Sequence, residues 1–248
     1  MARVGKHLEG DYEALKEQIR RSPAVYADET SWWVGGPGWW LWDFTTPEET
    51  VYVVEHCRGQ QIVNDMLGEH FGGTLVSDCL SSYDPIECDK HKCYSHHLRA
   101  IADAMKRCPS SGFLRRVQAL LKLAMVWRDQ RGAPGYWEIV HGLERWADEL
   151  LTPFRADPEE ERVANRLRKR RAYLFTFLYK QEVEPTNNRA ERQLRPAVIA
   201  RKVSCGNKTV SGKHTWEILA SLSATCQQRD VPFPDFVAAK MPLLNRPP

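Results

Sequence analysis

The sequence predicts an α/β fold, in which a mixed five-stranded sheet is flanked by helices on both faces. Short apolar, β-prone runs in the first part of the chain alternate with helical segments, and three of them are spaced closely enough for an antiparallel meander. From about residue 112 to 181 the apolar residues instead recur with the period of a helix. This second stretch predicts an all-helical insertion into the sheet domain, placed before a further helix at about 187–201.

The strand signals all lie between residues 24 and 94. The expected strands are residues 24–28, 39–44, 50–55, 74–77 and a fifth near 91–94. A Gly-Gly-Pro-Gly turn leads into the second strand, and Gly72-Gly73 opens the fourth. Helical spacing of apolar residues predicts helices at about 8–21, 59–67, 81–86 and 97–105.

Glycine and proline divide the later helical block. Breaks at Ala133-Pro134-Gly135 and at Thr152-Pro153 separate roughly three helices, and a last helix is expected at about 214–229. The predicted organisation is a helical lead-in (residues 1–23), the first part of the sheet core (24–111), the helical insertion (112–184) and the C-terminal helices of the core (185–248).

Composition narrows the class of protein. The chain has 248 residues, of which 42% are hydrophobic and 27% charged, as expected for a folded globular protein with a full core. No apolar run approaches the roughly 20 residues of a membrane-spanning helix, and the N-terminus lacks the apolar segment of a signal peptide. Seven cysteines with scattered spacing favour a reducing cytoplasm over a disulfide framework. The net charge is only +3, so local clusters of charge are more informative.

Three acidic residues point to metal chemistry. Asp28 and Asp78 each end an expected strand, and Glu191 stands near the start of an expected helix. Two carboxylates about 4 Å apart repel by roughly 4 kcal/mol at an effective dielectric of 20. Cations bound between them would turn this repulsion into a net attraction. Mg²⁺ and Mn²⁺ prefer such oxygen ligands. In a two-metal site one ion activates the attacking oxygen, and the other stabilises the leaving oxygen. These residues are therefore the predicted catalytic residues and the ligands of two Mg²⁺ or Mn²⁺ ions.

Each of these acids also has a structural interpretation. Aspartates at strand ends often cap the following turn. Glu191 stands four residues before Arg195, the spacing of a surface ion pair on a helix. Glu29 and Glu182 are rivals for the third or an auxiliary ligand.

Several motifs occur in a recognisable order. They are residues 26–32 (Tyr-Ala-Asp-Glu-Thr-Ser-Trp), 75–78 (Leu-Val-Ser-Asp) with Ser82-Tyr83-Asp84, 93–99 (Cys-Tyr-Ser-His-His-Leu-Arg), and 187–192 (Asn-Asn-Arg-Ala-Glu-Arg) with Arg201-Lys202. Together they resemble bacterial insertion-sequence transposases of the IS-sixty-six type, over about residues 8–238. The resemblance implies a ribonuclease H-like catalytic domain with a DDE triad, whose positions match Asp28, Asp78 and Glu191. It also implies DNA cleavage followed by strand transfer from a 3′-hydroxyl, which moves an insertion sequence.

The resemblance implies partners as well. Element ends and target DNA would be the substrates, the chain would act as a homo-oligomer, and it would work in the bacterial cytoplasm at the nucleoid. Relatives carry N-terminal regions of DNA-binding and zinc-binding character. We expect those functions to be absent from this chain or supplied by accessory proteins that recognise the DNA ends.

Basic residues surround the expected catalytic glutamate, and they are the candidate DNA contacts: Arg189, Arg192, Arg195, Arg201, Lys202 and Lys208. A denser basic cluster at residues 162–171 follows Glu159-Glu160-Glu161. It has two interpretations, a DNA contact or a solvated helix face balanced by those acids.

A second group of candidates follows the fifth expected strand. His96, His97 and Arg99 would lie near the metal ions and support their ligands, and a cap between strand and helix is the plain alternative. Cys88, His91, Cys93 and His96 are ligand types that zinc prefers. Strand alternation would split them across two faces, so a structural or supporting role is preferred to zinc binding.

Two other functions remain open. One is a ribonuclease H-like nuclease that cleaves DNA without strand transfer. The other is a catalytically inactive transposase remnant that binds DNA or a partner protein.

Overall fold

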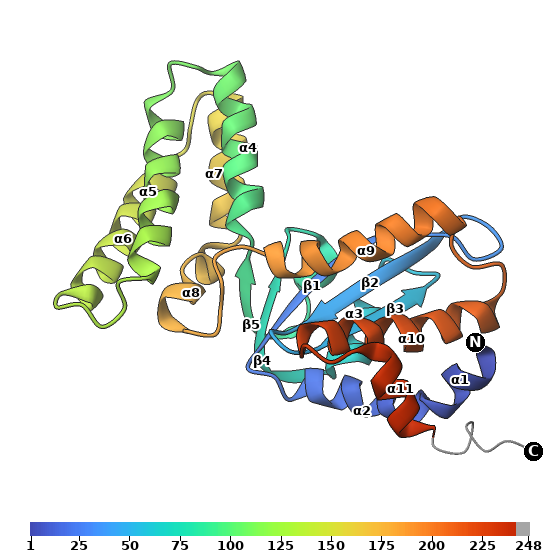
Figure 1. The fold of residues 1–248 in the computed structure, drawn as a ribbon. Helices are drawn as coiled ribbons and strands as arrows, with labels where there is room; N and C mark the ends of the chain where they lie inside the picture. Colours follow the sequence, from blue (N-terminus) through green and yellow to red (C-terminus); the bar gives the residue numbers. More distant parts are fainter. Residues whose placement is uncertain (242–248) are drawn as a thin grey trace, which may run out of the picture. The chain divides into compact units, whose positions relative to one another are not determined.

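The computed structural model describes residues 1–241, which form two compact units (Figure 1). The first unit is built from residues 1–75, 80–88 and 188–241. The second unit is built from residues 76–79 and 89–187. Each unit has its own internal packing.

A five-stranded sheet runs in the order β3-β2-β1-β4-β5. The strands are β1 (Ala24–Trp32), β2 (Trp39–Thr45), β3 (Thr50–Glu55), β4 (His70–Ser77) and β5 (Glu87–Lys92). β1 pairs antiparallel with β2, and β2 pairs antiparallel with β3, as expected for a meander. The predicted α/β class with a mixed five-stranded sheet flanked by helices is confirmed.

Three predicted strands had wrong bounds. β4 begins at His70 rather than at residue 74, so Gly72 and Gly73 lie inside the strand instead of opening it. β1 does not end at Asp28 but continues to Trp32, because its second half pairs residue by residue with β2 as far as Trp39. The fifth strand precedes the expected position near 91–94, because Cys93 is already the N-terminal cap of helix α4 (Tyr94–Arg107). β3 has the predicted bounds.

The first unit contains the N-terminal and C-terminal helices. They are α1 (Ala2–His7), α2 (Glu9–Arg20), α3 (Gln60–Leu67), α9 (Asn188–Ser204), α10 (Val210–Gln228) and α11 (Phe233–Lys240). The helices predicted at about 8–21, 59–67, 187–201 and 214–229 are confirmed within a few residues. The helix expected at 81–86 is only one 3₁₀ turn, η1 (Ser81–Tyr83).

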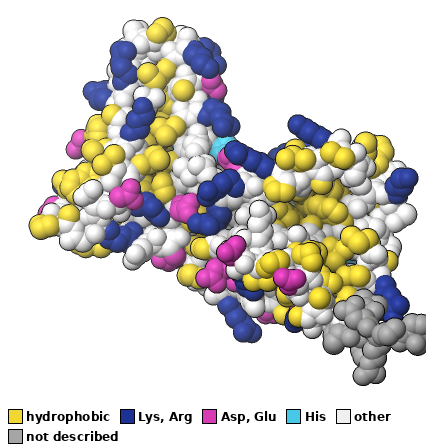
Figure 2. Space-filling view, viewed as in Figure 1, with side chains coloured by type: hydrophobic (Ala, Val, Ile, Leu, Met, Phe, Trp, Pro, Cys, Tyr) yellow, Lys and Arg dark blue, Asp and Glu magenta, His cyan; other side chains and the backbone are white. Residues whose placement is uncertain are grey.

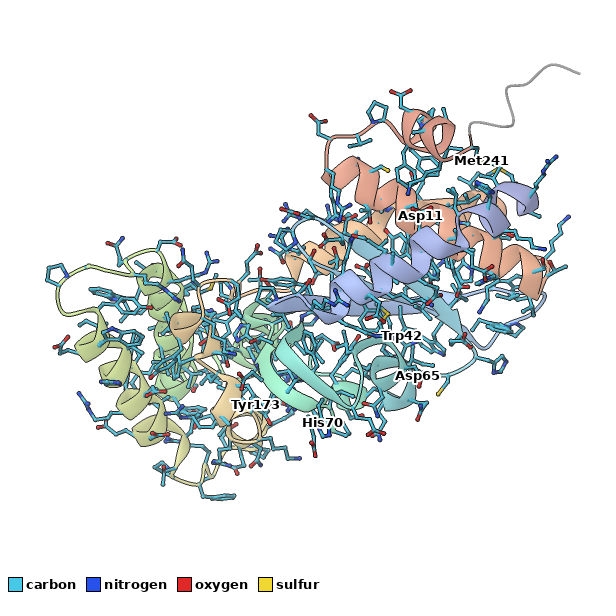
Figure 3. The ribbon with its side chains drawn as sticks, turned by 90° about the horizontal axis from the view of Figure 1, so that it is seen from below. Asp11, Trp42, Asp65, His70, Tyr173 and Met241 are labelled. Atoms are coloured by element: carbon cyan, nitrogen blue, oxygen red, sulfur yellow. The ribbon has the colours of Figure 1, made fainter. Side chains whose placement is uncertain are left out.

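The meander has two differently covered faces. On one face Trp42 and Phe44 pack in the same core cluster as side chains of α2 and α3. Trp42 is fully buried, its Nε1 donates to the carbonyl of Cys57 at 3.2 Å, and Figure 3 shows it beside these helices. On the other face Leu41 and Val54 pack in one cluster with Leu194 of α9. Burying side chains of this size contributes roughly 1.5–3 kcal/mol each.

Helix α10 covers the outer edge of β3. The amides of Thr50, Tyr52 and Val54 donate to side chains four residues apart on α10: Thr225 Oγ1 at 3.1 Å, Ser221 Oγ at 2.8 Å and Glu217 Oε1 at 2.5 Å. Four residues of a helix span about 6 Å along its axis, and two residues of a strand span about the same length. Every fourth side chain of α10 can therefore meet every second amide of β3. An edge strand with free amides would be open to pairing with another chain, and α10 closes it.

Replacing Ser221 by alanine is expected to lower the free energy of unfolding by about 1–3 kcal/mol, because the buried amide of Tyr52 loses its acceptor. Urea denaturation followed by circular dichroism would measure the change. Ser223→Ala on the same helix is the matched control and should change stability by under about 0.5 kcal/mol. Equal effects of the two substitutions would contradict the role given to Ser221.

The second unit is helical apart from its short strand segments. It contains α4, α5 (Gly112–Arg128), α6 (Tyr136–Leu151), α7 (Pro158–Arg168), η2 (Arg171–Tyr173) and α8 (Thr176–Tyr179). The predicted breaks at 133–135 and 152–153 fall before α6 and after it. Asp157 is the N-cap of α7, and its Oδ1 accepts the amides of Glu159 at 2.8 Å and Glu160 at 3.1 Å.

The basic cluster at 162–171 is largely paired with acids of the same unit. Arg162 contacts Glu159 at 2.8 Å, and Arg168 contacts Glu161 at 2.8 Å. Arg171 contacts Asp148 at 2.7 Å. The interpretation of this cluster as a balanced helix face is therefore favoured over DNA contact for these three arginines. Other Lys and Arg side chains gather at the end of the unit where α4 meets α5 (Figure 2).

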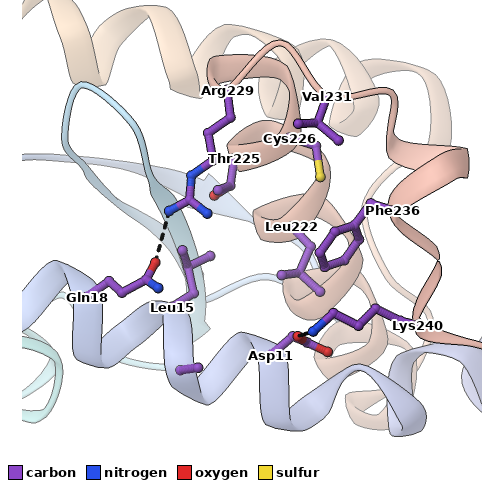
Figure 4. A pocket seen from close by; sticks show the side chains of 11 residues that line it. Asp11, Leu15, Gln18, Leu222, Thr225, Cys226, Arg229, Val231, Phe236 and Lys240 are labelled. Atoms are coloured by element: carbon purple, nitrogen blue, oxygen red, sulfur yellow. Dashed lines mark hydrogen bonds and ion pairs between the residues drawn. The ribbon is translucent and has the colours of Figure 1, made fainter.

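A pocket of about 270 Å³ lies between α2, α10 and α11 (Figure 4). The acid in its lining, Asp11, is paired with Lys240, and Arg229 donates to Gln18 at 3.0 Å. The pocket therefore offers no set of carboxylates for a metal. None of the helices in residues 1–241 combines the length and the apolar character that crossing a membrane requires.

Candidate active site

Asp28 lies in the middle of β1, directly opposite Asp43 of β2. Residues opposite each other in an antiparallel pair point to the same face, here the face that also carries Leu41 and Tyr52 and packs against α9. The side chain of Asp28 is half-buried, and its Oδ1 accepts the amide of Glu29 at 3.0 Å.

Glu191 stands in the first turn of α9 and is half-buried. Three contacts hold α9 against the meander. Leu194 packs in one cluster with Leu41, and the hydroxyl of Tyr52 donates to the carbonyl of Gln193 at 2.5 Å. The Arg189 guanidinium lies over the ring of Tyr26 on β1, 5.3 Å from the ring centre. The helix that carries Glu191 and the strand that carries Asp28 are thus in direct contact within one unit.

Asp43 was not among the predicted site residues. Its side chain is fully buried, and within residues 1–241 neither carboxyl oxygen has a hydrogen-bond partner. Burial, and then the neighbouring charge of Asp28, hold the pKa of Asp43 well above its usual range. The sequence signal was a single acid inside the apolar strand Trp39–Thr45, on the face of Leu41, and strand alternation alone would have marked it.

Glu29, a rival ligand, points to the opposite face of the sheet. Its carboxylate accepts from Arg58 Nη2 at 2.7 Å and from the hydroxyl of Tyr83 at 2.7 Å. Its side chain is only 2% exposed, so these two donors enclose it. Glu29 is therefore a structural residue rather than a metal ligand. Glu182, the other rival, is exposed in the second unit.

Asp78 directly follows β4, as predicted, and belongs to the second unit. Residues on both sides of it are anchored there. The carbonyl of Ser77 accepts the amide of Cys93 at 2.9 Å, and its hydroxyl accepts from the buried Lys92 at 3.2 Å. The carbonyl of Cys79 accepts from Arg170 at 3.1 Å. The main chain on both sides of Asp78 is therefore held in place.

The residues after β5 divide into buried and exposed ones. His97 is buried, and its Nδ1 accepts from Arg166 at 3.3 Å. Burial, followed by the charge of Arg166, holds the pKa of His97 well below its usual range, so the ring is neutral. Arg99 is exposed. Burial raises the pKa of the Cys93 thiol, but hydrogen bonds from His96 and from the amide of Asn187 outweigh it and lower the pKa.

The sequence comparisons decide the family. The model of the family described as "Transposase IS66 family" matches residues 1–215, which is most of the chain. The chain belongs to the IS66 transposase family. The predicted resemblance is thereby confirmed.

A curated relative of this IS66-family chain is the "Uncharacterized protein y4qI" of Sinorhizobium fredii (strain NBRC 101917 / NGR234). It is 26% identical over 268 aligned residues, which cover 93% of this chain and 49% of the relative. The chain thus spans about half the length of that relative. No solved structure matches the chain.

The candidate DNA contacts of this transposase-family chain differ in their surroundings. Arg201 bonds to β1 through the carbonyl of Ser31, the Ser31 hydroxyl at 2.9 Å and Thr30 Oγ1 at 3.2 Å, which ties the end of α9 to the sheet. Four others are exposed: Arg192, Arg195, Lys202 and Lys208. Figure 2 shows Lys and Arg side chains standing out from the surface where Figure 1 draws α9.

The zinc-type ligands before α4 are partly engaged with the main chain. His91 is buried, its Nδ1 lies 3.2 Å from the carbonyl of Tyr173, and its Nε2 lies 3.1 Å from the carbonyl of Pro185. Burial lowers the pKa of His91 to about 4, although these two carbonyls act in the other direction. Both ring nitrogens face carbonyls, so His91 has a structural role. This removes one of the four candidate zinc ligands named from the sequence.

Proposed function

We propose that this chain is the catalytic domain of a DDE transposase. Asp28, Asp78 and Glu191 would hold two Mg²⁺ or Mn²⁺ ions. The observation that supports this most is the packing of α9 on β1, which keeps the helix of Glu191 against the strand of Asp28. Asp78 completes the set in this proposal, since it follows β4, the neighbour of β1 in the sheet order.

The proposal includes a ribonuclease H-like core. Three antiparallel strands with two more strands on the side of β1, and helices on both faces, support that fold. In this assignment residues 1–23 lead in, residues 24–111 and 185–248 form the core, and residues 112–184 are the helical insertion. The insertion would separate Glu191 from the two aspartates in sequence.

The residues present fit divalent ions of the hard type. The proposed ligands are all carboxylates, the donors that Mg²⁺ and Mn²⁺ prefer. Asp28 is half-buried, so the site proposed for it is not sealed within the core. Asp28 and Asp43 lie opposite each other on one face, and a bound cation would favour the ionised form of both.

The chemistry would run in two steps. When bound, the ions would activate the attacking oxygen and stabilise the leaving oxygen. In cleavage, water attacks a phosphorus at the element end, the bond to the 3′ oxygen breaks, and that oxygen leaves as a hydroxyl. In strand transfer, this 3′-hydroxyl attacks a phosphorus of the target, and the target's own 3′ oxygen leaves. The chain's part is to hold the carboxylates and to position the DNA backbone.

The exposed basic residues of α9 would position that backbone. Replacing Arg192 or Arg195 by alanine is expected to weaken DNA binding without changing sequence preference. Each substitution should also reduce the slope of log affinity against log salt by about one. Fluorescence anisotropy with a labelled duplex at several salt concentrations measures both quantities. Arg21→Ala, an exposed arginine that follows α2, is the control, and an equal effect there would contradict the assignment to α9.

We further propose that the chain acts as a homo-oligomer in the bacterial cytoplasm at the nucleoid, where its DNA lies. Recognition of the element ends would come from accessory proteins or from further sequence. The relative y4qI is about twice as long as its matched part. We therefore propose the transposase activity for this chain together with any further sequence that the activity requires.

Strand transfer is tested with labelled duplexes taken from the DNA that flanks the chain's coding region. The full chain, Mn²⁺ and a supercoiled target plasmid are incubated with duplexes ending in a 3′-hydroxyl, and with matched duplexes ending in a 3′-dideoxynucleotide. A transposase joins label to the plasmid from the first set only. Nicking without joining would indicate the nuclease alternative. Binding without any metal-dependent cleavage would indicate the inactive remnant.

A further inference from the structure

Three side chains form a row across the meander, on the face that packs against α9. Asp28 of β1 lies opposite Asp43 of β2, and Asp43 lies opposite Tyr52 of β3. Side chains directly opposite each other have Cβ atoms about 5 Å apart. Asp43 therefore stands between a proposed metal ligand and a tyrosine, and it is the fully buried member of the two acids.

The neighbours of Asp43 use their polar atoms elsewhere. The hydroxyl of Tyr52 donates to the carbonyl of Gln193 at 2.5 Å. On the same strand and the same face, the buried Thr45 bonds to Thr50 Oγ1 at 2.7 Å and to the carbonyl of Glu49 at 3.0 Å. Asp43 is different, because within residues 1–241 both its oxygens are buried and have no hydrogen-bond partner.

A buried carboxyl group without a partner lowers stability, and native proteins keep few of them. Buried acids are normally paired with a cation or hydrogen-bonded. A valine or leucine at this position in β2 would pack without that loss. The presence of an acid beside Asp28 therefore points to a ligand that the two share.

We propose that Asp43 is a fourth acidic residue of the metal site, and that the divalent cation held by Asp28 is the partner that its buried oxygens lack. This inference rests on the proposed function, in which Asp28 is a metal ligand. Asp43, which is fully buried, would stabilise the ion together with the half-buried Asp28. Its expected contribution is to affinity for the metal, since supporting residues of this kind typically contribute roughly 10- to 100-fold.

The test compares the full chain with Asp43→Asn, Asp43→Val and Asp28→Asn. Mn²⁺ binding is measured by electron paramagnetic resonance, and melting temperature is measured with and without Mn²⁺. Glu29→Gln is the matched control, because Glu29 is the next acid on β1 but faces Arg58 and Tyr83 on the other side. The Mn²⁺ affinity of this control should stay within a factor of two of that of the unchanged chain.

Both Asp43 variants should bind Mn²⁺ roughly 10- to 100-fold more weakly than the unchanged chain. Without metal, Asp43→Val should melt at the same temperature or higher, since it removes an unpaired buried carboxyl. Unchanged Mn²⁺ affinity in both variants, with loss in Asp28→Asn, would overturn the role of Asp43 and leave the proposed function standing. No Mn²⁺ binding by the unchanged chain would overturn both. Failure of both Asp43 variants to fold would also overturn the inference, because it would make Asp43 a structural residue.

Discussion

Replacing Asp28 by asparagine is expected to slow metal-dependent DNA nicking by about 10³-fold while leaving the fold intact. Asparagine keeps the shape of the side chain but removes the charge that would hold the metal. Stabilisation by a metal is worth several kcal/mol, and each 1.36 kcal/mol corresponds to a tenfold change in rate. Initial rates of conversion of supercoiled plasmid to open circles, with Mn²⁺ in excess, measure this effect.

The control for Asp28→Asn is Glu29→Gln. Glu29 is adjacent in sequence, but its carboxylate is bound by Arg58 and Tyr83 on the opposite face of β1. Its substitution should lower the melting temperature, because Arg58 loses its partner, and leave the nicking rate of the folded protein within a few-fold. If Glu29→Gln abolished nicking and Asp28→Asn did not, the assignment of faces on β1 would be wrong.

Replacing Glu217 by alanine is expected to lower the free energy of unfolding by about 3 kcal/mol, because it breaks a buried ion pair, although Lys213 keeps Glu55 at 3.2 Å and the carbonyl of Val54 at 2.6 Å. Glu217 and Lys213 are both buried, with Oε1 and Nζ 3.3 Å apart. The same Oε1 accepts the amide of Val54 at 2.5 Å, so the edge of β3 loses an acceptor as well. Burial raises the pKa of Glu217, while the charge of Lys213 and the amide of Val54 act against that rise.

Equilibrium unfolding in urea, followed by tryptophan fluorescence, measures the loss at position 217. The control is Glu9→Ala, which removes an exposed partner of His214, 3.0 Å away. An exposed pair of this kind contributes about 0–1 kcal/mol. A loss at Glu217 no larger than the loss at Glu9 would show that α10 does not stabilise the edge of β3 through this residue.

The ordered motifs were enough to predict the family. The class of fold could be predicted because each strand of the meander begins with a clear local signal. The bounds of β3 followed from its run of β-branched residues between a turn and a charged segment. The second half of β1 could not be predicted in this way. Its polar residues are satisfied by partners distant in sequence: Arg58 and Tyr83 bind Glu29, and Arg201 binds Thr30 and Ser31.

The same limit applies to the site. Strand alternation could have placed Asp43 on the face of Leu41, but its position opposite Asp28 depends on the register between β1 and β2. The repeat of polar residues at Glu217, Ser221 and Thr225 was visible in the sequence, yet its partners are amides of β3 about 170 residues earlier. Such long-range pairings come from packing rather than from local sequence preference.

The most direct test of the central claim is Mn²⁺-dependent nicking of supercoiled plasmid by the unchanged chain, by Asp78→Asn and by Glu191→Gln. These two residues come from different parts of the chain, and the proposal makes them ligands of the same ions. We expect nicking by the unchanged chain that requires Mn²⁺ or Mg²⁺ and is lost in both variants. Equal nicking by all three proteins, or none by any of them, would contradict a working carboxylate site.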